Sequence, residues 1–350
     1  MNTMTLTTTT TRDIVPGNLL AQAGQAANEA ASRHVFVNYR TRKAANTIRR
    51  QDADLALFAS FLSDVAGIPT GDLAHEPDAW TGCAWGIVQA FVEWQLGSGY
   101  AVGTVNVRLS TVKTYAKLAA QAGALDRGEY AMIRAIEGYR HAEGANLDKN
   151  RVSRGLDTRI GHKKAGPVSI TSEQAQRLKS EHANDGQGRR DALLMCLLVD
   201  LGVRVSELGD LRVSDVDLDA GTLHVWRRKV QGTETEHATF ELGTIPDTQR
   251  ALRDYLAGPD APTDGALLVT SNRYGDLTGG AMSTRAIAKR VRYLGRHILA
   301  VDGLSPHDMR HHAATSYGKT KTTRDLMSIF GWNSPAMATR YQAAAETIRV

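Results

Sequence analysis

The sequence predicts a mainly α-helical chain of two domains, with a small β-sheet in the second domain. Three observations predict this class. Apolar residues recur at helical spacing through most of the chain after residue 44, residues 148–164 are basic and almost without apolar side chains, and strand-forming residues gather in residues 213–242. A length of 350 residues allows about two to three domains. With 42% hydrophobic and 23% charged residues, the composition excludes a fibrous or wholly disordered chain.

Several classes of protein are excluded by simple features. The longest apolar run, Ala192 to Val199, is far shorter than the ~20 residues that cross a bilayer. The N-terminus has no apolar core of a secretory signal. The sequence has two cysteines, Cys83 and Cys196, with no Cys-x-x-Cys pair and no framework of several cysteines, so neither a zinc knuckle nor a disulfide scaffold is expected. We therefore expect a cytoplasmic protein without a membrane partner. The net charge of +5 favours a polyanionic partner only weakly.

The first domain is expected over residues 44–147. Residues 1–43 are polar and predict a flexible arm with room for one short helix. Four amphipathic helices follow, with apolar faces at residues 55–65, 87–92, 105–118 and 132–136. Glycines follow the first three faces, at Gly67, Gly97 and Gly123. Short connections between such helices predict a small all-helical domain.

Residues 148–168 predict a basic linker between the domains. Its cations are Lys149, Arg151, Arg154, Arg159, Lys163 and Lys164. Such a run is usually a solvated tether, and contact with nucleic acid is the alternative.

The second domain is expected over residues 169–350 and combines helices with a sheet. Thr171 and Gln174 form a capping-box pattern that opens its first helix. Residues 222–226 and 238–242 predict two paired strands, and we expect the apolar run 267–269 to join the same sheet. Helices are predicted near residues 248–256 and over residues 283–299. The latter has one apolar and one strongly basic face.

The segment from Ser305 to Arg310 can bind an anion. Ser305 is a capping residue and Pro306 suits the first helical position. His307 and Arg310, three residues apart, then share one face near a helix N-terminus, where negative charge is favoured. A phosphate group fits this arrangement. Taken alone, the pair is more often an ordinary surface pair on a capped helix.

Four other side chains also have an ordinary interpretation when each is taken alone. Arg204 with Glu207 fits a structural salt bridge, and Lys229 fits a charge that blocks the edge of a hairpin. Trp332 and Tyr341 fit packing residues on helices.

The order and spacing of these residues together resemble the tyrosine recombinase/integrase family. The resemblance is carried by the motifs Gly202-Val203-Arg204-Val205-Ser206-Glu207-Leu208, Pro306-His307-Asp308-Met309-Arg310-His311, and Gly331-Trp332-Asn333-Ser334 with Arg340-Tyr341. Residues 104–112 resemble the family's helical core-binding (SAM-like) domain, so the resemblance covers residues 44–345. Trp332, where most members have His, and the hairpin residues 224–229 look closer to the Cre branch than to the Xer branch.

The resemblance implies a site-specific recombinase that needs neither metal nor ATP. Arg204 and Arg310 would neutralise the non-bridging oxygens of a DNA phosphate, with Glu207 orienting Arg204. Tyr341 would attack the phosphorus and form a 3′-phosphotyrosyl link, and His307 is the candidate base.

The remaining catalytic assignments are Lys229 and Trp332. Lys229 would protonate the departing 5′ oxygen; because the hairpin has one Lys beside two Arg, its exact register is open. Trp332 would donate its indole N–H to the phosphate and pack the site. No cofactor is expected.

The resemblance also implies partners. It predicts a two-domain clamp on double-stranded DNA with inverted-repeat recombination sites. A homotetramer would act through a Holliday junction in the nucleoid, for a mobile element, phage or plasmid, and accessory DNA-bending proteins can assist. The predicted DNA contacts are Lys149, Arg151, Arg154, Lys163, Lys164, Arg108, Lys113, Arg285 and Lys289.

Three alternatives stay open at this point. A type IB topoisomerase or a telomere resolvase could use the same residues. A non-catalytic DNA-binding regulator would explain the charge but would leave the shared order of the motif residues a coincidence. His307, His311 and His312 lie on one predicted helix and could chelate a metal, but a third ligand at motif spacing is lacking, so no metal is expected.

Overall fold

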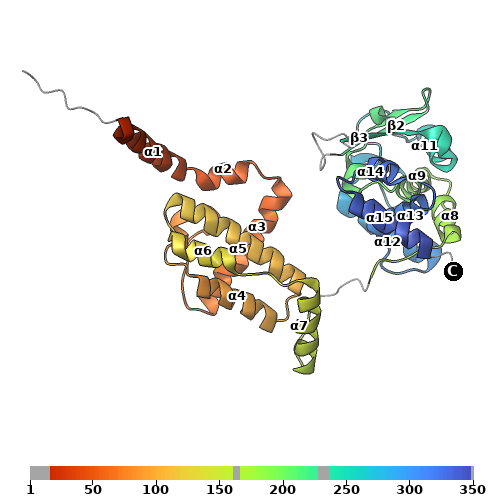
Figure 1. Ribbon diagram of the computed structural model, residues 1–350. Helices are drawn as coiled ribbons and strands as arrows, with labels where there is room; N and C mark the ends of the chain where they lie inside the picture. Colours follow the sequence, from red (N-terminus) through yellow and green to blue (C-terminus); the bar gives the residue numbers. More distant parts are fainter. Residues whose placement is uncertain (1–15, 161–165, 228–235, 348–350) are drawn as a thin grey trace, which may run out of the picture. The chain divides into compact units, whose positions relative to one another are not determined.

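The chain folds into two compact units, residues 1–162 and 163–350. The computed structural model describes residues 16–160, 166–227 and 236–347 (Figure 1). The boundary between the units lies within the linker predicted at residues 148–168. Each unit is described by itself below. Within the described ranges, no helix combines the length and the apolar character needed to cross a membrane.

The first unit is all-helical, as the sequence predicts (Figure 1). Its helices are α1 (Pro16–Ser32), α2 (Val35–Thr41), α3 (Ala45–Asp64), α4 (Trp85–Gly97), α5 (Val102–Ala122), α6 (Arg127–Ala135) and α7 (His141–Ser153), with a 3₁₀ turn η1 (Pro77–Trp80).

The core of the first unit forms where α3, α4 and α5 bring their apolar faces together. Phe58, Phe91, Trp80 and Tyr115 are fully buried, and the rings of Phe58 and Phe91 lie 4.9 Å apart. These are the faces that the helical spacing predicts. Helix α5 ends where Gly123 adopts a φ of 82°, a left-handed conformation that suits glycine. The four predicted helices are therefore confirmed.

The prediction of a flexible arm over residues 1–43 is wrong for its second part. Helix α2 docks on the domain because Phe36 is buried, with its ring centroid 5.6 Å from that of Tyr115. Arg40 also donates to Asp52 on α3 (3.2 Å). Tyr39 adds an edge contact to the Tyr115 ring at 5.7 Å, so a few side chains on a mostly polar segment attach it to the domain.

The prediction of a linker beginning at residue 148 is also corrected. Helix α7 continues to Ser153, and Arg151 on its last turn is buried. The Arg151 guanidinium donates to the carbonyl oxygens of Asp157 (2.6 Å) and Tyr100 (3.1 Å). This arginine therefore ties the end of α7 to its own unit.

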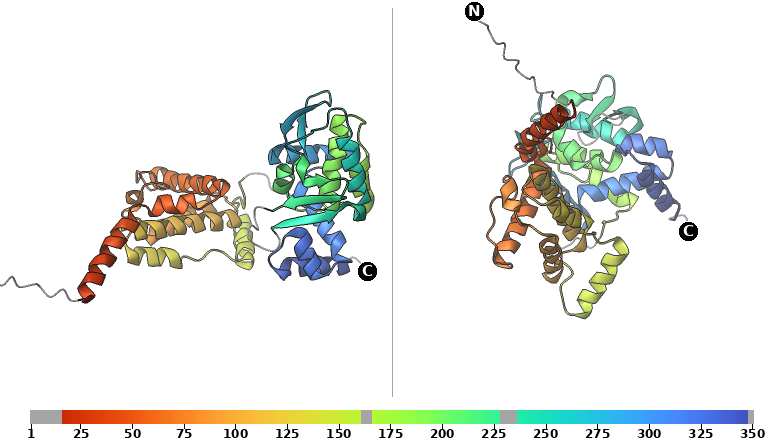
Figure 2. Two further views of the ribbon diagram at one scale, coloured as in Figure 1. Left: turned by 90° about the horizontal axis from the view of Figure 1, so that it is seen from above. Right: turned by 60° about the vertical axis from the view of Figure 1, so that its left-hand side comes forward.

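The second unit combines helices with two small antiparallel sheets (Figure 2). Its helices are α8 (Ser172–Ser180), α9 (Gly186–Asp200), α10 (Val205–Asp210), α11 (Pro246–Leu256), α12 (Thr284–Leu299), α13 (Pro306–Gly318), α14 (Thr323–Phe330) and α15 (Pro335–Thr347). Its strands are β1 (Val216–Asp217), β2 (Thr222–Trp226), β3 (His237–Glu241), β4 (Val269–Ser271) and β5 (Leu277–Ala281).

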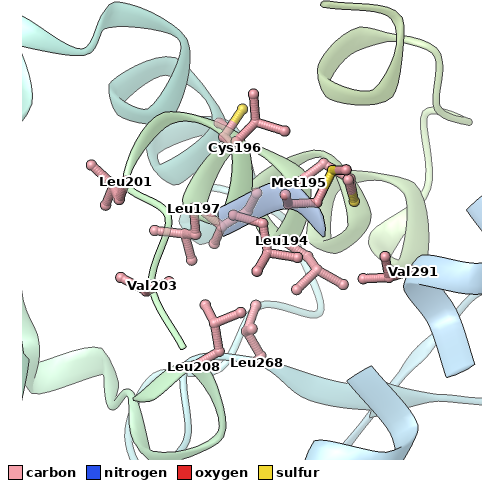
Figure 3. Close-up of a cluster of buried hydrophobic side chains, with 14 of the residues drawn as sticks. Leu194, Met195, Cys196, Leu197, Leu201, Val203, Leu208, Leu268 and Val291 are labelled. Carbon is pink, nitrogen blue, oxygen red and sulfur yellow. The ribbon is translucent and has the colours of Figure 1, made fainter. Parts of the chain in front are cut away.

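Helix α9 is the centre of the second core. Helices α8, α11 and α13 pack against it. Leu194, Met195 and Leu197 of α9 are fully buried, and Figure 3 shows them gathered with Leu208 and Val291 from α10 and α12. An apolar run that is buried on all sides has no helical periodicity to read, so the sequence does not mark this helix by period.

The sheets confirm one pairing and correct another. Strands β2 and β3 pair antiparallel, with Leu223 opposite Phe240, and the sheet order is β1-β2-β3. The run at residues 267–269 does not join this sheet. Strand β4 pairs instead with β5 in a separate two-stranded sheet. The sequence does not reveal β5, because Gly279 and Gly280 interrupt any strand pattern.

A buried ion network joins α9, α12 and β4 in the second unit. Asp191 on α9 is 1% exposed and accepts from Arg190 (2.7 Å) and from Arg290 on α12 (2.8 Å). Arg190 also donates to the carbonyl of Val269 in β4 (3.1 Å). One carboxylate thus holds two guanidinium groups between a helix and a sheet.

We predict that Asp191→Ala destabilises the second unit by about 3–5 kcal/mol, because Arg190 would stay buried without its counter-charge. Urea unfolding measures the change. Asp302→Ala is the matched control, since it removes only the exposed pair with Arg296. Equal unfolding midpoints for the two variants would contradict a structural role for the network.

Candidate active site

The C-terminal end of α14 organises the polar part of the second unit. The last carbonyls of a helix lack partners within the helix and carry the negative end of its dipole. Four consecutive carbonyls here, of Ser328, Ile329, Phe330 and Gly331, each accept a hydrogen bond from an arginine side chain. Three arginines from three different segments converge in this way.

Arg227 is the most deeply buried of the three, with 2% of its surface exposed. It follows directly after β2 and donates to the carbonyl oxygens of Ser328 (2.6 Å) and Ile329. Burial lowers the pKa of this guanidinium, and Glu207 acts in the opposite direction. Sequence reasoning gave Arg227 no role, because a hairpin arginine does not reveal that its strand ends beside a distant helix terminus.

Arg310 on α13 donates to the carbonyls of Phe330 and Gly202 (2.7 Å to Gly202). Gly202 has a φ of +60°, and a Cβ there would lie 2.6 Å from the Phe330 ring, so a larger residue does not fit. Burial, followed by repulsion from Arg204, lowers the pKa of Arg310 to about 10. The group keeps its charge at neutral pH.

Arg204 is held by Glu207, as the sequence suggested. Its side chain donates to one carboxylate oxygen (2.7 Å), and its backbone N–H donates to the other (2.7 Å), which forms a capping box at the start of α10. A further N–H of the guanidinium donates to Gly331 (3.1 Å). Glu207 therefore both starts the helix and aims the arginine.

The charges in this cluster do not balance. Arg204 and Arg227 both act to lower the pKa of Arg310, Arg204 acts to lower that of Arg227, and the Glu207 carboxylate opposes them in both cases. Among the described residues, these three positive groups against one negative group leave an excess of positive charge in a largely buried place. An anion with several oxygens suits such a cluster.

Trp332 and Tyr341 close the apolar side of this cluster. Their rings stack 5.2 Å apart with planes 1° from parallel, and Trp332 also stacks on Phe330 at 4.9 Å. The guanidinium carbon of Arg310 lies 5.9 Å from the Trp332 ring centroid. Trp332 therefore packs between Tyr341 and Phe330 and connects the Tyr341 ring with Arg310.

The Tyr341 hydroxyl contacts a histidine that the sequence did not select as its partner. Its oxygen lies 2.5 Å from Nδ1 of His311, and Nε2 of His311 lies 2.9 Å from Nε2 of His307. His307, the predicted base, is thus separated from the hydroxyl by His311. The i, i+4 spacing of the two histidines was visible in the sequence, but it suggested only a metal site.

Burial raises the pKa of the Tyr341 hydroxyl, against the opposing influence of Arg310 and Arg340. The phenol is therefore protonated at neutral pH. A reaction that uses its oxygen as a nucleophile needs a proton acceptor, and the contact above provides one.

Comparison with known proteins identifies this arrangement. Residues 169–347, just over half of the chain, match the model of the phage integrase family. The chain belongs to the phage integrase family. The resemblance to tyrosine recombinases and integrases that the motifs indicated is thereby confirmed.

The curated relatives of this family member include tyrosine recombinases named XerC. That of Pseudomonas entomophila is 28% identical over 210 residues, which cover 59% of this chain and 65% of that protein. That of Corynebacterium glutamicum is 25% identical over 278 residues, which cover 78% of this chain and 73% of that protein. The match to the Pseudomonas protein thus spans just under two thirds of its length. The proposed closeness to the Cre branch stays a prediction.

Solved structures support the fold. The Tn1549 transposon integrase in complex with circular intermediate DNA has a TM-score of 0.60 at 15% identity, covering 91% of this chain and 99% of that one. A lambda integrase tetramer bound to a Holliday junction has a TM-score of 0.56 at 16% identity, covering 88% and 75%. The two-domain integrase fold is therefore shown.

Three predicted residues of this integrase family member lie outside the described residues. They are Lys229, Lys163 and Lys164. Their assignments as leaving-group acid and as DNA contacts stay predictions.

The other predicted DNA contacts divide into two groups. Lys149, Arg154, Arg285 and Lys289 are exposed, and the last two lie one turn apart on α12. By contrast, Arg108 stacks on the Tyr100 ring at 4.2 Å, and Lys113 donates to the carbonyl of Arg134 (3.0 Å). These two have partners within their own unit that DNA would have to displace.

The prediction for Arg151 is corrected. Its guanidinium is buried against the carbonyls of its own unit, so it stabilises the turn after α7 and does not face solvent as a DNA contact would. In the part of the chain that the structure describes, no three His, Cys, Asp or Glu side chains form a group that could hold a metal ion.

We predict that Arg227→Met destabilises the second unit by about 1–3 kcal/mol for each helix carbonyl that loses its donor. Urea unfolding provides the measurement, with Arg253→Met, an exposed arginine on α11, as the control. If Arg227→Met unfolds at the same urea concentration as the control, the arginine does not hold the end of α14.

Proposed function

We propose that this protein is a site-specific tyrosine recombinase, which cleaves and rejoins DNA through a 3′-phosphotyrosyl intermediate. One observation carries the proposal. The Tyr341 ring stacks on Trp332 beside the buried guanidinium of Arg310, within a single chain. A phenol, an excess of positive charge and a proton acceptor are the three requirements for opening a phosphodiester without a metal ion.

Each group has a role that its chemistry supports. Arg204 and Arg310 bind the two non-bridging oxygens of the scissile phosphate and stabilise the charge that grows in the transition state. Their bonds to Gly331 and Phe330 hold the guanidinium planes in advance, so little reorganisation is needed when DNA binds. Trp332 orients the Tyr341 ring by stacking and offers its indole N–H to the phosphate.

The covalent link between Tyr341 and the DNA keeps the energy of the phosphodiester bond that is broken. The phenol oxygen of Tyr341 forms a bond to phosphorus while the bond from phosphorus to the 5′ oxygen breaks. Lys229 delivers a proton to that leaving oxygen. A 5′ hydroxyl from another strand reverses the step, so rejoining needs neither ATP nor another cofactor.

The finer features of the proposal concern assembly and biological role. The lambda integrase of the comparison is a tetramer on a Holliday junction, and the transposon integrase holds circular intermediate DNA. We propose that this chain likewise forms a homotetramer on paired inverted-repeat sites and exchanges strands through such a junction. It would act in the cytoplasm at the nucleoid, for a mobile element, phage or plasmid, with accessory DNA-bending proteins where the site requires them.

We predict that Tyr341→Phe abolishes the covalent protein–DNA adduct on a nicked suicide substrate and leaves duplex binding within about twofold of wild type, since only the nucleophilic oxygen is removed. Denaturing gels measure the adduct, and gel shifts measure binding. An adduct that persists in this variant would place the nucleophile elsewhere. Failure of the wild-type chain to form any adduct would favour a non-catalytic regulator. Relaxation of supercoiled DNA without a recombination site would favour a topoisomerase.

We predict that Arg310→Ala lowers the single-turnover cleavage rate about 100- to 1,000-fold, because the guanidinium that would donate charged hydrogen bonds to the phosphate is lost. Arg204→Ala should act in the same direction. Arg253→Ala, on the exposed face of α11, serves as the control. A rate for Arg310→Ala close to that of the control would exclude the phosphate-binding role.

A further inference from the structure

The two histidines beside Tyr341 form a continuous hydrogen-bonded line. His307 and His311 lie one turn apart on α13, and their Nε2 atoms are 2.9 Å apart. The other nitrogen of His311, Nδ1, is 2.5 Å from the Tyr341 hydroxyl on α15. His311 is half-buried, whereas His307 is exposed. The line therefore runs from the buried phenol to the surface.

The positions of the hydrogens follow from the chemistry of imidazole. A neutral imidazole has one N–H donor and one acceptor nitrogen, so two facing Nε2 atoms must share one hydrogen. Two neutral arrangements satisfy both contacts. In the outward arrangement each donor hydrogen points away from Tyr341 and toward the surface, and in the inward arrangement each points toward Tyr341. In the outward arrangement the phenol donates to Nδ1 of His311, and Nε2–H of His311 donates to Nε2 of His307. Attack by the phenol oxygen starts from this arrangement.

We propose that His311, rather than His307, takes the proton from Tyr341, and that His307 receives the proton that His311 releases. As the bond from Tyr341 to phosphorus forms, the phenol proton moves to Nδ1 of His311, and the proton on Nε2 of His311 moves to Nε2 of His307. The proton ends on His307, where solvent can remove it. The leaving 5′ oxygen takes its proton from a separate acid. The proposal rests on the proposed recombinase function.

The charges around His311 suit a proton acceptor. The groups that face it are His307, Asp308 and Arg310 on α13, and Arg340 and Tyr341 on α15. Burial, followed by repulsion from His307, lowers the pKa of His311, and Asp308 acts in the opposite direction. The imidazole is therefore neutral at pH 7 and has a free lone pair.

The residues packed around Tyr341 offer few other proton acceptors for its hydroxyl. The segment 167–170, which lines the same cavity as His311 and Tyr341, carries Pro, Val, Ser and Ile and so has no titratable side chain. His312, the next residue on α13, bonds instead to the backbone of Ile170. This makes His312 a matched control, since it is a partly buried histidine that lines the same cavity but has its hydrogen bond to the backbone of Ile170, whereas His311 bonds to the phenol.

The test measures single-turnover adduct formation on a nicked suicide duplex between pH 5.5 and 9. We expect His311→Gln to lower the rate at pH 7 about 100-fold or more, the usual effect of a general base. Its rate should rise steadily with pH, since the phenol must then ionise by itself. His307→Gln should lose less, and His312→Gln should follow the wild-type profile. A wild-type profile for His311→Gln, or a larger loss for His307→Gln, would overturn the proposal.

A second measurement does not depend on the folding of the histidine variants. In ¹⁵N-histidine spectra of the chain without DNA, Tyr341→Phe should shift the Nδ1 resonance of His311 and leave that of His312 in place. An unmoved His311 resonance would refute the contact. If the His311 resonance shifts but the wild-type chain forms no covalent adduct, the contact is correct and the proposed recombinase function is wrong. The catalytic role of His311 would then also be wrong.

Discussion

The second unit depends on how the negative end of one short helix is neutralised. Helix α14 leaves its terminal carbonyls without partners, and arginines from three separate segments donate to them. Each arginine thereby ties its own segment to α14, so the end of β2, the start of α10 and the body of α13 meet at one point. The same interaction supplies the stability of the fold and the positive charge of the site.

This arrangement explains why the positive groups tolerate burial. A buried guanidinium is costly unless its N–H groups are bonded, and the helix carbonyls bond several of them without cancelling the charge, as carboxylates would. With Glu207 as the carboxylate partner of Arg204, the described cluster keeps an excess of positive charge. The aromatic stack of Phe330, Trp332 and Tyr341 places the Tyr341 ring beside these arginines.

Much of the architecture is readable from local patterns. The helices of the first unit have clear apolar faces, the hairpin has strand-forming residues, and capping residues such as Thr171 and Ser305 mark helix starts. The predictions from local sequence patterns failed for two reasons, a weak apolar pattern and a buried charged residue. Helix α2 has one fully buried apolar side chain, Phe36, and otherwise attaches through polar and aromatic contacts, and β5 contains adjacent glycines, so neither has an apolar pattern strong enough to be recognised. The end of α7 was assigned to a linker because Arg151 counts as a charge in the sequence, whereas in the fold it is a buried hydrogen-bond donor.

The residues of the site likewise fall into those that the sequence indicated and those that only the structure revealed. The order and spacing of the motifs, through their resemblance to the tyrosine recombinase/integrase family, selected Arg204, Arg310 and Tyr341 as candidates, and the fold brings these three side chains close together. Arg227 and His311 emerged only from the folded chain. Their roles come from neighbours about 100 and 30 residues away, and a hydrogen bond depends on distances and directions in space that are set when the elements pack. The sequence carries the chemistry of the groups, and packing selects which groups meet.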